Sequence, residues 1–253
     1  MKEPVQLRLT KVHALTQAEA VEQICRAAAG DAPFLVVTPN LSHLSRMQRE
    51  PEFRRQYDQA DLALPDGWPV VRLVRLHGAT EAVRVAGSEL VAPLCAEAAR
   101  RGLAVGFVGG AADAAAKAAD VVRRDNPGLR VTLVDPATRG FDSDDEALRR
   151  WVLGLPDEWP EILFLGLGEP RERRVALRLR EDPRARVIIA VGKAIEFTAG
   201  TAQRAPEWFV SHNLEWLHRA ITEPRRLGPR YLQGLVDLGP MYVRERRAAR
   251  RAR

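Results

Sequence analysis

Short apolar runs alternate with longer amphipathic segments up to about residue 200. The runs that predict buried strands are 34–38, 62–64, 103–108, 131–134, 162–165 and 187–191, with a further strand expected within 7–12. Segments with helical periodicity lie between them at 17–29, 41–48, 68–76, 87–101, 111–125, 144–153 and 170–181. Alternation of strands and helices is typical of crossover units. The pattern therefore predicts an α/β fold with a Rossmann-like, mainly parallel sheet and flanking helices.

Beyond Gly200 the alternation stops and the pattern is helical only. Helices are expected around 204–222 and 224–237, interrupted at prolines, and the last segment, 244–253, is expected to be frayed and solvated. We therefore divide the chain into an α/β core over 1–200 and a helical basic appendage over 201–253.

Positive charge is concentrated in the appendage. The chain of 253 residues has a net charge of +6, and residues 219–253 alone carry ten arginines against three acidic residues. Such a cationic end predicts an anionic partner, either a membrane surface or a nucleic acid, but no nucleic-acid reader motif accompanies it. No apolar run is long enough to span a bilayer, and no signal-peptide core is present. Cys25 and Cys95 fall on apolar helix faces and are expected to be buried thiols in a reducing cytosol.

Polar residues follow the predicted strands, and open α/β sheets bind ligands at the carboxyl ends of their strands. Thr38 and Asn40 follow one strand, and Asp66 lies between another strand and a helix. An isolated Asp-Gly in this position is more often a helix cap than a general base. Arg84 precedes a helix for which Ser88 is the expected cap.

Two glycine turns, 106–110 and 166–168, each follow an apolar strand and open a helix. Backbone N–H groups in such turns bind phosphate oxygens, so a diphosphate ligand is a candidate. The dinucleotide fingerprint is incomplete because Arg171 occupies the place of its third glycine, which disfavours a nicotinamide oxidoreductase. The acidic cluster 142–146 is better explained by helix capping, and the histidines lack metal-ligand spacing, so no metal site is predicted.

In order and spacing, a series of these motifs resembles the WecG/TagA/CpsF glycosyltransferases, from about residue 7 to residue 238. The motifs are 38–40, 60–67, 84–87, 107–110, 165–170, 192–200, 204–208 and 214–217. The resemblance implies an inverting, metal-independent enzyme without a cofactor. It would transfer a sugar from a UDP-sugar to a polyprenyl-diphosphate-linked saccharide, for wall teichoic acid, enterobacterial common antigen or exopolysaccharide.

The resemblance further implies a cytoplasmic enzyme that is peripheral to the inner face of the bacterial membrane. The donor would be UDP-N-acetylmannosamine or a glucose-type UDP-sugar, and homo-oligomer formation is left open. The alternative reading is a nucleotide- or nucleic-acid-binding protein that uses the basic tail without transferase activity.

Residue roles follow from the same resemblance. Asp66 would be the base that deprotonates the acceptor hydroxyl, Thr38 and Asn40 would bind the sugar, and Arg84 would offset diphosphate charge. The remaining candidate substrate-binding residues are Gly109, Gly110, Gly166, Gly168, Glu172, Glu196, Arg219, Arg226 and Arg230. The three arginines would stabilise the departing UDP.

Glu172, Glu196 and Ala86 depart from the family pattern, which commonly has Gln, Asp and Thr at these places. A carboxylate only accepts hydrogen bonds, whereas an amide also donates, so the donor sugar can differ from N-acetylmannosamine.

The appendage also interleaves apolar residues with its arginines. These residues are Trp208, Phe209, Trp216, Leu217, Ile221, Leu227, Tyr231, Leu232, Leu235 and Val236. In most proteins such a stripe only faces the core, but a lipid-linked acceptor favours a helix that lies in the membrane interface.

Overall fold

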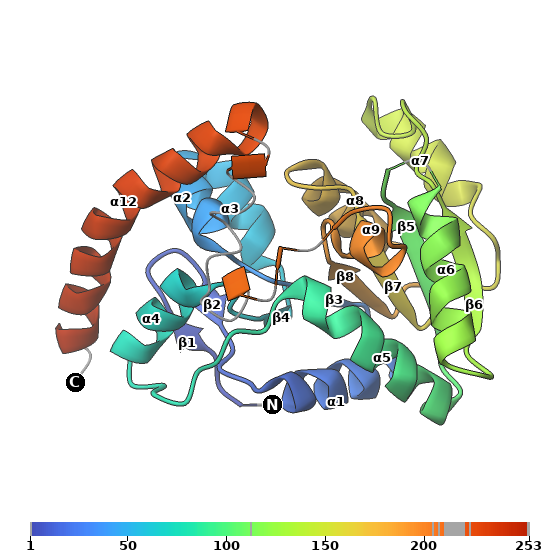
Figure 1. The fold of residues 1–253 in the computed structure, drawn as a ribbon, viewed down its shortest axis with the longest axis horizontal. Coiled ribbons are helices and arrows are strands. Elements are labelled where there is room, and N and C mark those ends of the chain that lie inside the picture. Colours follow the sequence, from blue (N-terminus) through green and yellow to red (C-terminus); the bar gives the residue numbers. More distant parts are fainter. Residues whose placement is uncertain are drawn as a thin grey trace.

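The computed structural model describes residues 2–111, 113–203, 205–206, 208–209, 221–222 and 224–251 (Figure 1). Its main sheet has six strands: β3 (Phe34–Val37), β4 (Leu62–Ala63), β5 (Ala104–Gly109), β6 (Arg130–Asp135), β7 (Ile162–Gly166) and β8 (Val187–Ala190). Their order is β4-β3-β8-β7-β5-β6, and every neighbouring pair is parallel. The predicted α/β class and parallel sheet are confirmed.

The prediction of a single strand within 7–12 is wrong, because this part of the chain forms a hairpin. β1 (Val5–Gln6) and β2 (Lys11–Val12) pair antiparallel in a separate two-stranded sheet. The segment cannot stay extended because the N–H of Leu7 donates to the carbonyl of Thr10 at 3.0 Å, which closes a turn. The N–H of His13 then donates to the carbonyl of Ala63 at 2.7 Å and ties this hairpin to β4.

Two hydrophobic clusters cover the two faces of the main sheet, and side chains alternate between them along each strand. On β7, Leu163 and Leu165 enter one cluster, whereas Ile162 and Phe164 enter the other. This two-residue period is what a strand buried on both faces requires. On the Ile162 face lie α1 (Gln17–Ala28), α5 (Gly87–Arg101), α6 (Ala114–Asp125) and α9 (Ala194–Thr198). The other cluster includes α2 (Leu41–Arg49), α3 (Pro51–Asp58), α4 (Trp68–Leu76), α7 (Asp145–Leu153) and α8 (Arg171–Arg180).

Helix caps were partly predictable. Thr16, directly before the predicted helix at 17–29, caps α1, because its side chain accepts from the N–H of Glu19. Asp144 caps α7 by accepting from the N–H of Ala147 at 2.8 Å. Helices α3 and α9 were not predicted. The buried thiols of Cys25 and Cys95 are confirmed, and burial raises their pKa to about 11 and about 12.

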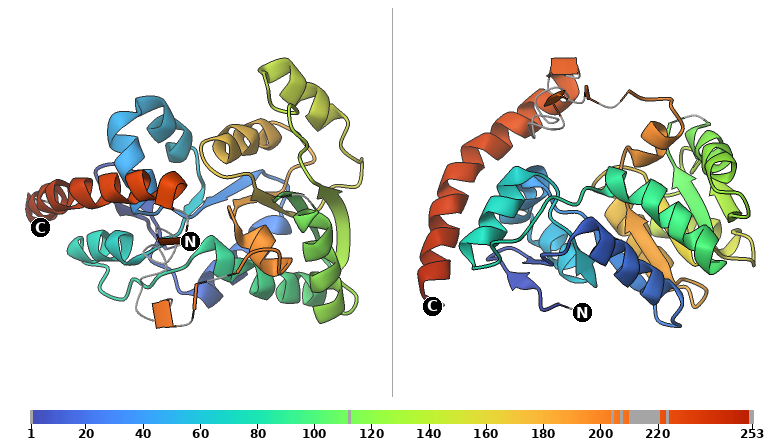
Figure 2. Two further views of the ribbon diagram at one scale, coloured as in Figure 1. Left: turned by 45° about the horizontal axis from the view of Figure 1, so that its top comes forward. Right: turned by 60° about the horizontal axis from the view of Figure 1, so that its bottom comes forward.

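The appendage differs from the prediction. A single helix, α12 (Pro224–Arg251), continues through Pro229 and Pro240 and curves along α2 and α4 (Figures 1 and 2). The final segment is therefore helical up to Arg251 instead of frayed. Tertiary packing explains this, since Met241, Glu245 and Ala249 are buried against the body.

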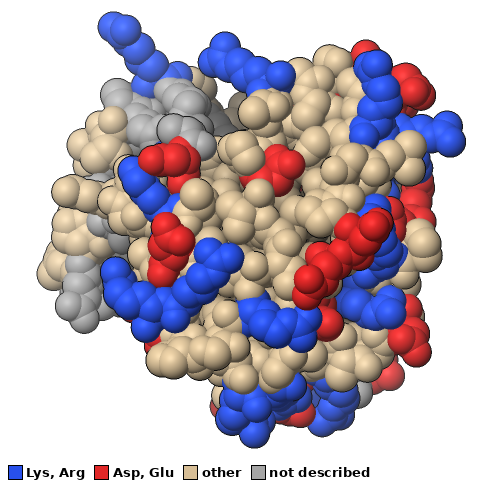
Figure 3. Space-filling view, turned by 90° about the vertical axis from the view of Figure 1, so that its right-hand side faces the viewer, with Lys and Arg blue, Asp and Glu red and all other residues tan. Residues whose placement is uncertain are grey.

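An apolar stripe lies on the exposed surface of α12. Leu232, Leu235, Val236 and Val243 recur at helical spacing and are among the most exposed large apolar side chains, with Leu232 at 65%. Within the described residues, none of the helices is both long and apolar enough to cross a bilayer. Figure 3 shows that basic and acidic side chains are interspersed on the face around α6 and β6.

Candidate active site

Asp66 lies just after β4, at the carboxyl edge of the main sheet. Its N–H donates to the carbonyl of Pro39 at 3.0 Å, which joins the loop after β4 to the loop after β3. The cap of α4 is Gly67, at φ 90°, and no side chain caps that helix. The helix-cap interpretation of Asp66 is therefore wrong. The carboxylate is 28% exposed and accessible to a ligand.

Arg84 lies beside Asp66 but has a second carboxylate partner. Its Nη1 is 3.8 Å from Oδ1 of Asp66, and its Nη2 is bonded to Oε1 of Glu89. Glu89 belongs to the first turn of α5, whose cap is Ala86 and not the expected Ser88. The charge of Arg84 is thus already balanced within the protein, and Glu89 is a site residue that sequence reasoning missed. The sequence did contain an indication of this pair, because Glu89 follows Arg84 by five positions.

Thr38 is buried where α5 meets the end of β8. A side chain added at Gly87 would come within 3.2 Å of Val191 Cα and 3.4 Å of Thr38 Oγ1, so glycine permits this close approach. Asn40 has a local role as well, because its Oδ1 accepts from the N–H of His43 at 3.1 Å and caps α2. Thr38, Asn40 and Asp66 are therefore brought together on adjoining loops, as predicted.

The two glycine turns contact each other directly. The N–H of Gly110 donates to the carbonyl of Gly166 at 2.8 Å, and a Cβ at Gly109 would lie 2.7 Å from that same oxygen. The N–H of Gly110 thus already has an acceptor within the protein, and the phosphate-binding role of this turn stays a prediction. Gly168, at φ 73°, has open space at its Cα, so its left-handed backbone alone favours glycine there.

Glu172 is buried under the second glycine turn. It is 3% exposed, and its Oε1 accepts from the N–H of Gly192 at 3.0 Å, at the end of β8. Burial, followed by the nearby charge of Glu169, raises the pKa of Glu172 to about 8. The raised pKa favours the protonated form, whose O–H can donate a hydrogen bond as an amide does.

A buried charged cluster continues behind Glu172. Arg173 is fully buried, pairs with Glu169 at 2.8 Å, and lies 4.4 Å from the ring centre of Tyr57. The hydroxyl of Tyr57 is 2.7 Å from Nδ1 of His43, and burial raises the pKa of this tyrosine. The cluster links α8 through α3 to the loop that holds Asn40. Sequence reasoning missed it because α3 was not predicted.

The sequence profile of the "Glycosyl transferase WecG/TagA/CpsF family" matches residues 5–252. The chain belongs to this family. It is 27% identical over 191 residues to an N-acetylglucosaminyldiphosphoundecaprenol N-acetyl-beta-D-mannosaminyltransferase of Bacillus spizizenii, covering 76% of this chain and 72% of that protein. A protein of the same description from Bacillus subtilis is 24% identical over 167 residues, covering 66% of this chain and 63% of its own length.

The other predicted site residues of this glycosyltransferase family member lie in different parts of the chain. Glu196 lies on α9, and its Oε2 is buried without a hydrogen-bond partner among the described residues. Arg219 lies outside the described residues, whereas Arg226 and Arg230 belong to α12. Among the residues that the structure describes, no group of three or more His, Cys, Asp or Glu side chains is arranged to hold a metal ion. The binding roles of these residues remain predictions.

Proposed function

We propose that this protein transfers a hexose or N-acetylhexosamine from a UDP-sugar to a polyprenyl-diphosphate-linked saccharide, in cell-wall or exopolysaccharide synthesis. Membership of a glycosyltransferase family supports the reaction type. The names of both relatives, which specify an undecaprenyl-diphosphate-linked N-acetylglucosamine, support the acceptor class. These matches favour a transferase over a protein that only binds nucleotides or nucleic acid.

The observation that carries the proposal is the position of Asp66. It is a partly exposed carboxylate at the carboxyl edge of a parallel sheet, 3.8 Å from Arg84, and it does not cap its helix. Asp66 accepts the proton of the acceptor hydroxyl while that oxygen attacks the anomeric carbon. The bond from the anomeric carbon to the diphosphate oxygen breaks, UDP leaves, and the configuration inverts. Positioned base catalysis contributes on the order of 10²–10⁴-fold.

Charge develops on the departing UDP and needs donors other than Gly110, whose N–H is already bonded to Gly166. In this proposal no divalent metal takes part, and appendage arginines, including Arg226 and Arg230 on α12, neutralise the diphosphate. The Oε2 of Glu196, which has no hydrogen-bond partner among the described residues, accepts a hydrogen bond from a hydroxyl of the donor sugar, since an unpaired buried acceptor is costly.

We further propose that the enzyme works at the cytoplasmic face of the membrane as a peripheral protein. The exposed apolar stripe of α12 and its outward arginines would contact anionic lipid while the acceptor stays in the bilayer. This placement suits an acceptor that cannot leave the membrane.

The test is UDP release from a panel of UDP-sugars, with a short-chain polyprenyl-diphosphate N-acetylglucosamine as acceptor. At least one donor should give acceptor-dependent turnover, and Asp66→Asn should lower kcat about 10²-fold or more while UDP affinity is kept. Asp120→Asn, an exposed position on α6, is the matched control. Wild-type turnover in Asp66→Asn would refute the base assignment, and no turnover with any donor would refute the transferase proposal.

A further inference from the structure

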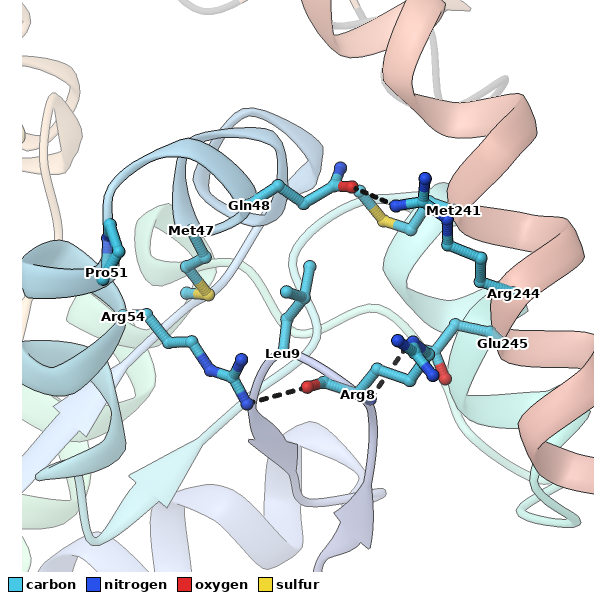
Figure 4. Close-up of a pocket in the computed structure, with 9 residues that line it drawn as sticks. All are labelled: Arg8, Leu9, Met47, Gln48, Pro51, Arg54, Met241, Arg244 and Glu245. Carbon is cyan, nitrogen blue, oxygen red and sulfur yellow. Dashed lines mark hydrogen bonds between the residues drawn. The ribbon is translucent and has the colours of Figure 1, made fainter.

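A pocket of about 250 Å³ lies between α12, the α2–α3 pair and the turn that joins β1 to β2 (Figure 4). It shares no residue with the candidate active site. Three arginines from three separate elements line it: Arg8 from the β1–β2 turn, Arg54 from α3 and Arg244 from α12. Its apolar lining comes from Leu9, Met47 and Met241, and both methionines are buried.

The arginines of this pocket make hydrogen bonds mainly to neutral oxygens. Nη2 of Arg54 donates to the carbonyl of Arg8 at 2.8 Å, and Nη1 of Arg244 donates to Oε1 of Gln48 at 3.4 Å (Figure 4). Within the part of the chain that the structure describes, neither Arg8 nor Arg244 has a carboxylate within ion-pair distance. By contrast, Arg46 on the adjacent helix α2 is paired with Glu50 at 2.6 Å. Arg54 also lies 4.0 Å from Asp58, so the excess positive charge of the pocket comes from Arg8 and Arg244.

The lining holds one carboxylate, that of Glu245, against three arginines, and this carboxylate is bonded to other groups. Its Oε1 accepts from the backbone N–H of Arg8 at 2.8 Å, and its Oε2 is 2.9 Å from Nε2 of His77. The side chain is 2% exposed, so it serves to hold α12 against the body. This contact uses the backbone N–H of Arg8 and not its guanidinium, which can therefore contact a ligand.

We propose that this pocket binds a phosphate monoester or diester. Guanidinium groups match phosphate oxygens in geometry and stay charged at all physiological pH values. The apolar lining restricts water next to those charges and suits the carbon skeleton of the ester. A ligand held between Arg8, Arg54 and Arg244 bridges the body and α12. The phosphate comes either from a phospholipid headgroup, since the exposed apolar face belongs to the same helix, or from a phosphate ester in solution.

The first experiment titrates the full-length protein with glycerol 1-phosphate by calorimetry. The wild type should show saturable binding, and the double variant Arg8→Ala/Arg244→Ala should bind at least about tenfold more weakly. Arg8→Ala keeps the backbone contact to Glu245, so α12 stays docked. The matched control is Arg246→Ala/Arg250→Ala, which removes the same charge from exposed positions that do not line the pocket.

The second experiment measures binding to phosphatidylglycerol vesicles and separates the two sources of phosphate. A larger loss in the pocket double variant than in the control double variant assigns a lipid headgroup. Equal vesicle binding in both variants, with glycerol 1-phosphate binding lost only in the pocket variant, assigns a phosphate ester in solution. The proposal is overturned if the wild type binds neither probe saturably, or if both double variants match it. None of these readouts depends on transferase activity, so their failure leaves the proposed function standing.

Discussion

Oε1 of Glu172 accepts a hydrogen bond from the backbone N–H of Gly192 at 3.0 Å, and the side chain of Glu172 is almost completely buried. This contact fixes the end of β8 from below, next to the two interlocked glycine turns. The buried carboxyl group also contributes to the pH dependence of the stability of the fold.

Replacing Glu172 with glutamine should remove part of that pH dependence. Because the folded pKa is raised from 4.5 to about 8, the folded state binds more protons than the unfolded chain between these values. The contribution of Glu172 is therefore fully present below pH 4.5 and is lost as the pH rises towards 8. Glu172→Gln keeps an acceptor for Gly192 and should be more stable than the wild type at pH 8 by up to about 4 kcal/mol.

The measurement is urea unfolding of both proteins across this pH range. Glu158→Gln, an exposed carboxylate, is the control and should show no such trend. If the difference between Glu172→Gln and the wild type stayed constant from pH 5 to pH 8, Glu172 would not titrate as described.

Glu89 should control the charge that Arg84 presents to Asp66 and to a substrate. Glu89→Gln removes the bonded carboxylate, so Arg84 is freed to move towards Asp66, 3.8 Å away. An arginine closer to Asp66 stabilises its charged form and makes it a weaker base, and we expect kcat to fall roughly tenfold. The pH profile of kcat is the deciding readout, because its acidic limb should shift to lower pH. An unchanged profile would mean that Glu89 acts only in folding.

Gly87→Ala should displace the end of β8. The added Cβ would lie 3.2 Å from Val191 Cα. Neither atom can move away by rotation of a side chain, because Cα belongs to the backbone and Cβ is attached directly to it. We expect a loss of about 1–3 kcal/mol in unfolding free energy, typical of overpacking. Gly154→Ala is the control, since its Cβ would make ordinary contacts at 3.5 Å. Equal thermal stability of the two variants would contradict the close approach at Gly87.

Glu245→Ala should loosen α12. The change leaves the N–H of Arg8 and Nε2 of His77 without their partner, which costs about 1–3 kcal/mol. Hydrogen exchange over residues 224–251 should rise, while exchange in β7 and β8 should stay unchanged. Arg246→Ala, an exposed change on the same helix, should not raise it. Unchanged protection of α12 in Glu245→Ala would show that its apolar contacts suffice.

The apolar stripe of α12 can be tested without removing the helix, whose inner face packs on the body. Leu232→Ser/Val236→Ser changes two exposed side chains and should weaken vesicle binding about tenfold, with little effect on stability. Leu153→Ser, an exposed leucine at the end of α7, is the control. Vesicle co-sedimentation at equal lipid charge gives the comparison, and equal loss in both would argue against the interfacial helix.

The sequence was sufficient for features that depend on local pattern. All six main strands were predicted from apolar runs, and Thr38, Asn40 and Asp66 were grouped because parallel strands end at one edge. It was insufficient where distant segments decide the outcome. Pro229 and Pro240 predicted breaks, yet contacts with α2 and α4 keep α12 continuous.

The same reason explains what was missed at the site. The Arg173–Glu169 pair and its contact with Tyr57 join α8 to α3, and no spacing in the sequence predicts that these two helices are in contact. The glycine turns were found correctly, but their use of each other's backbone groups depends on strand order.

The contact between Arg8 and Glu245 spans 237 positions of the chain. During synthesis the segment around Arg8 leaves the ribosome long before its partner, because folding proceeds as the chain emerges. The parallel sheet can therefore form before α12, which supplies part of the pocket lining, has been synthesised. We therefore expect α12 to dock after the sheet has formed, and a chain that ends before this helix should keep the sheet and the Asp66 loop but lack the basic pocket.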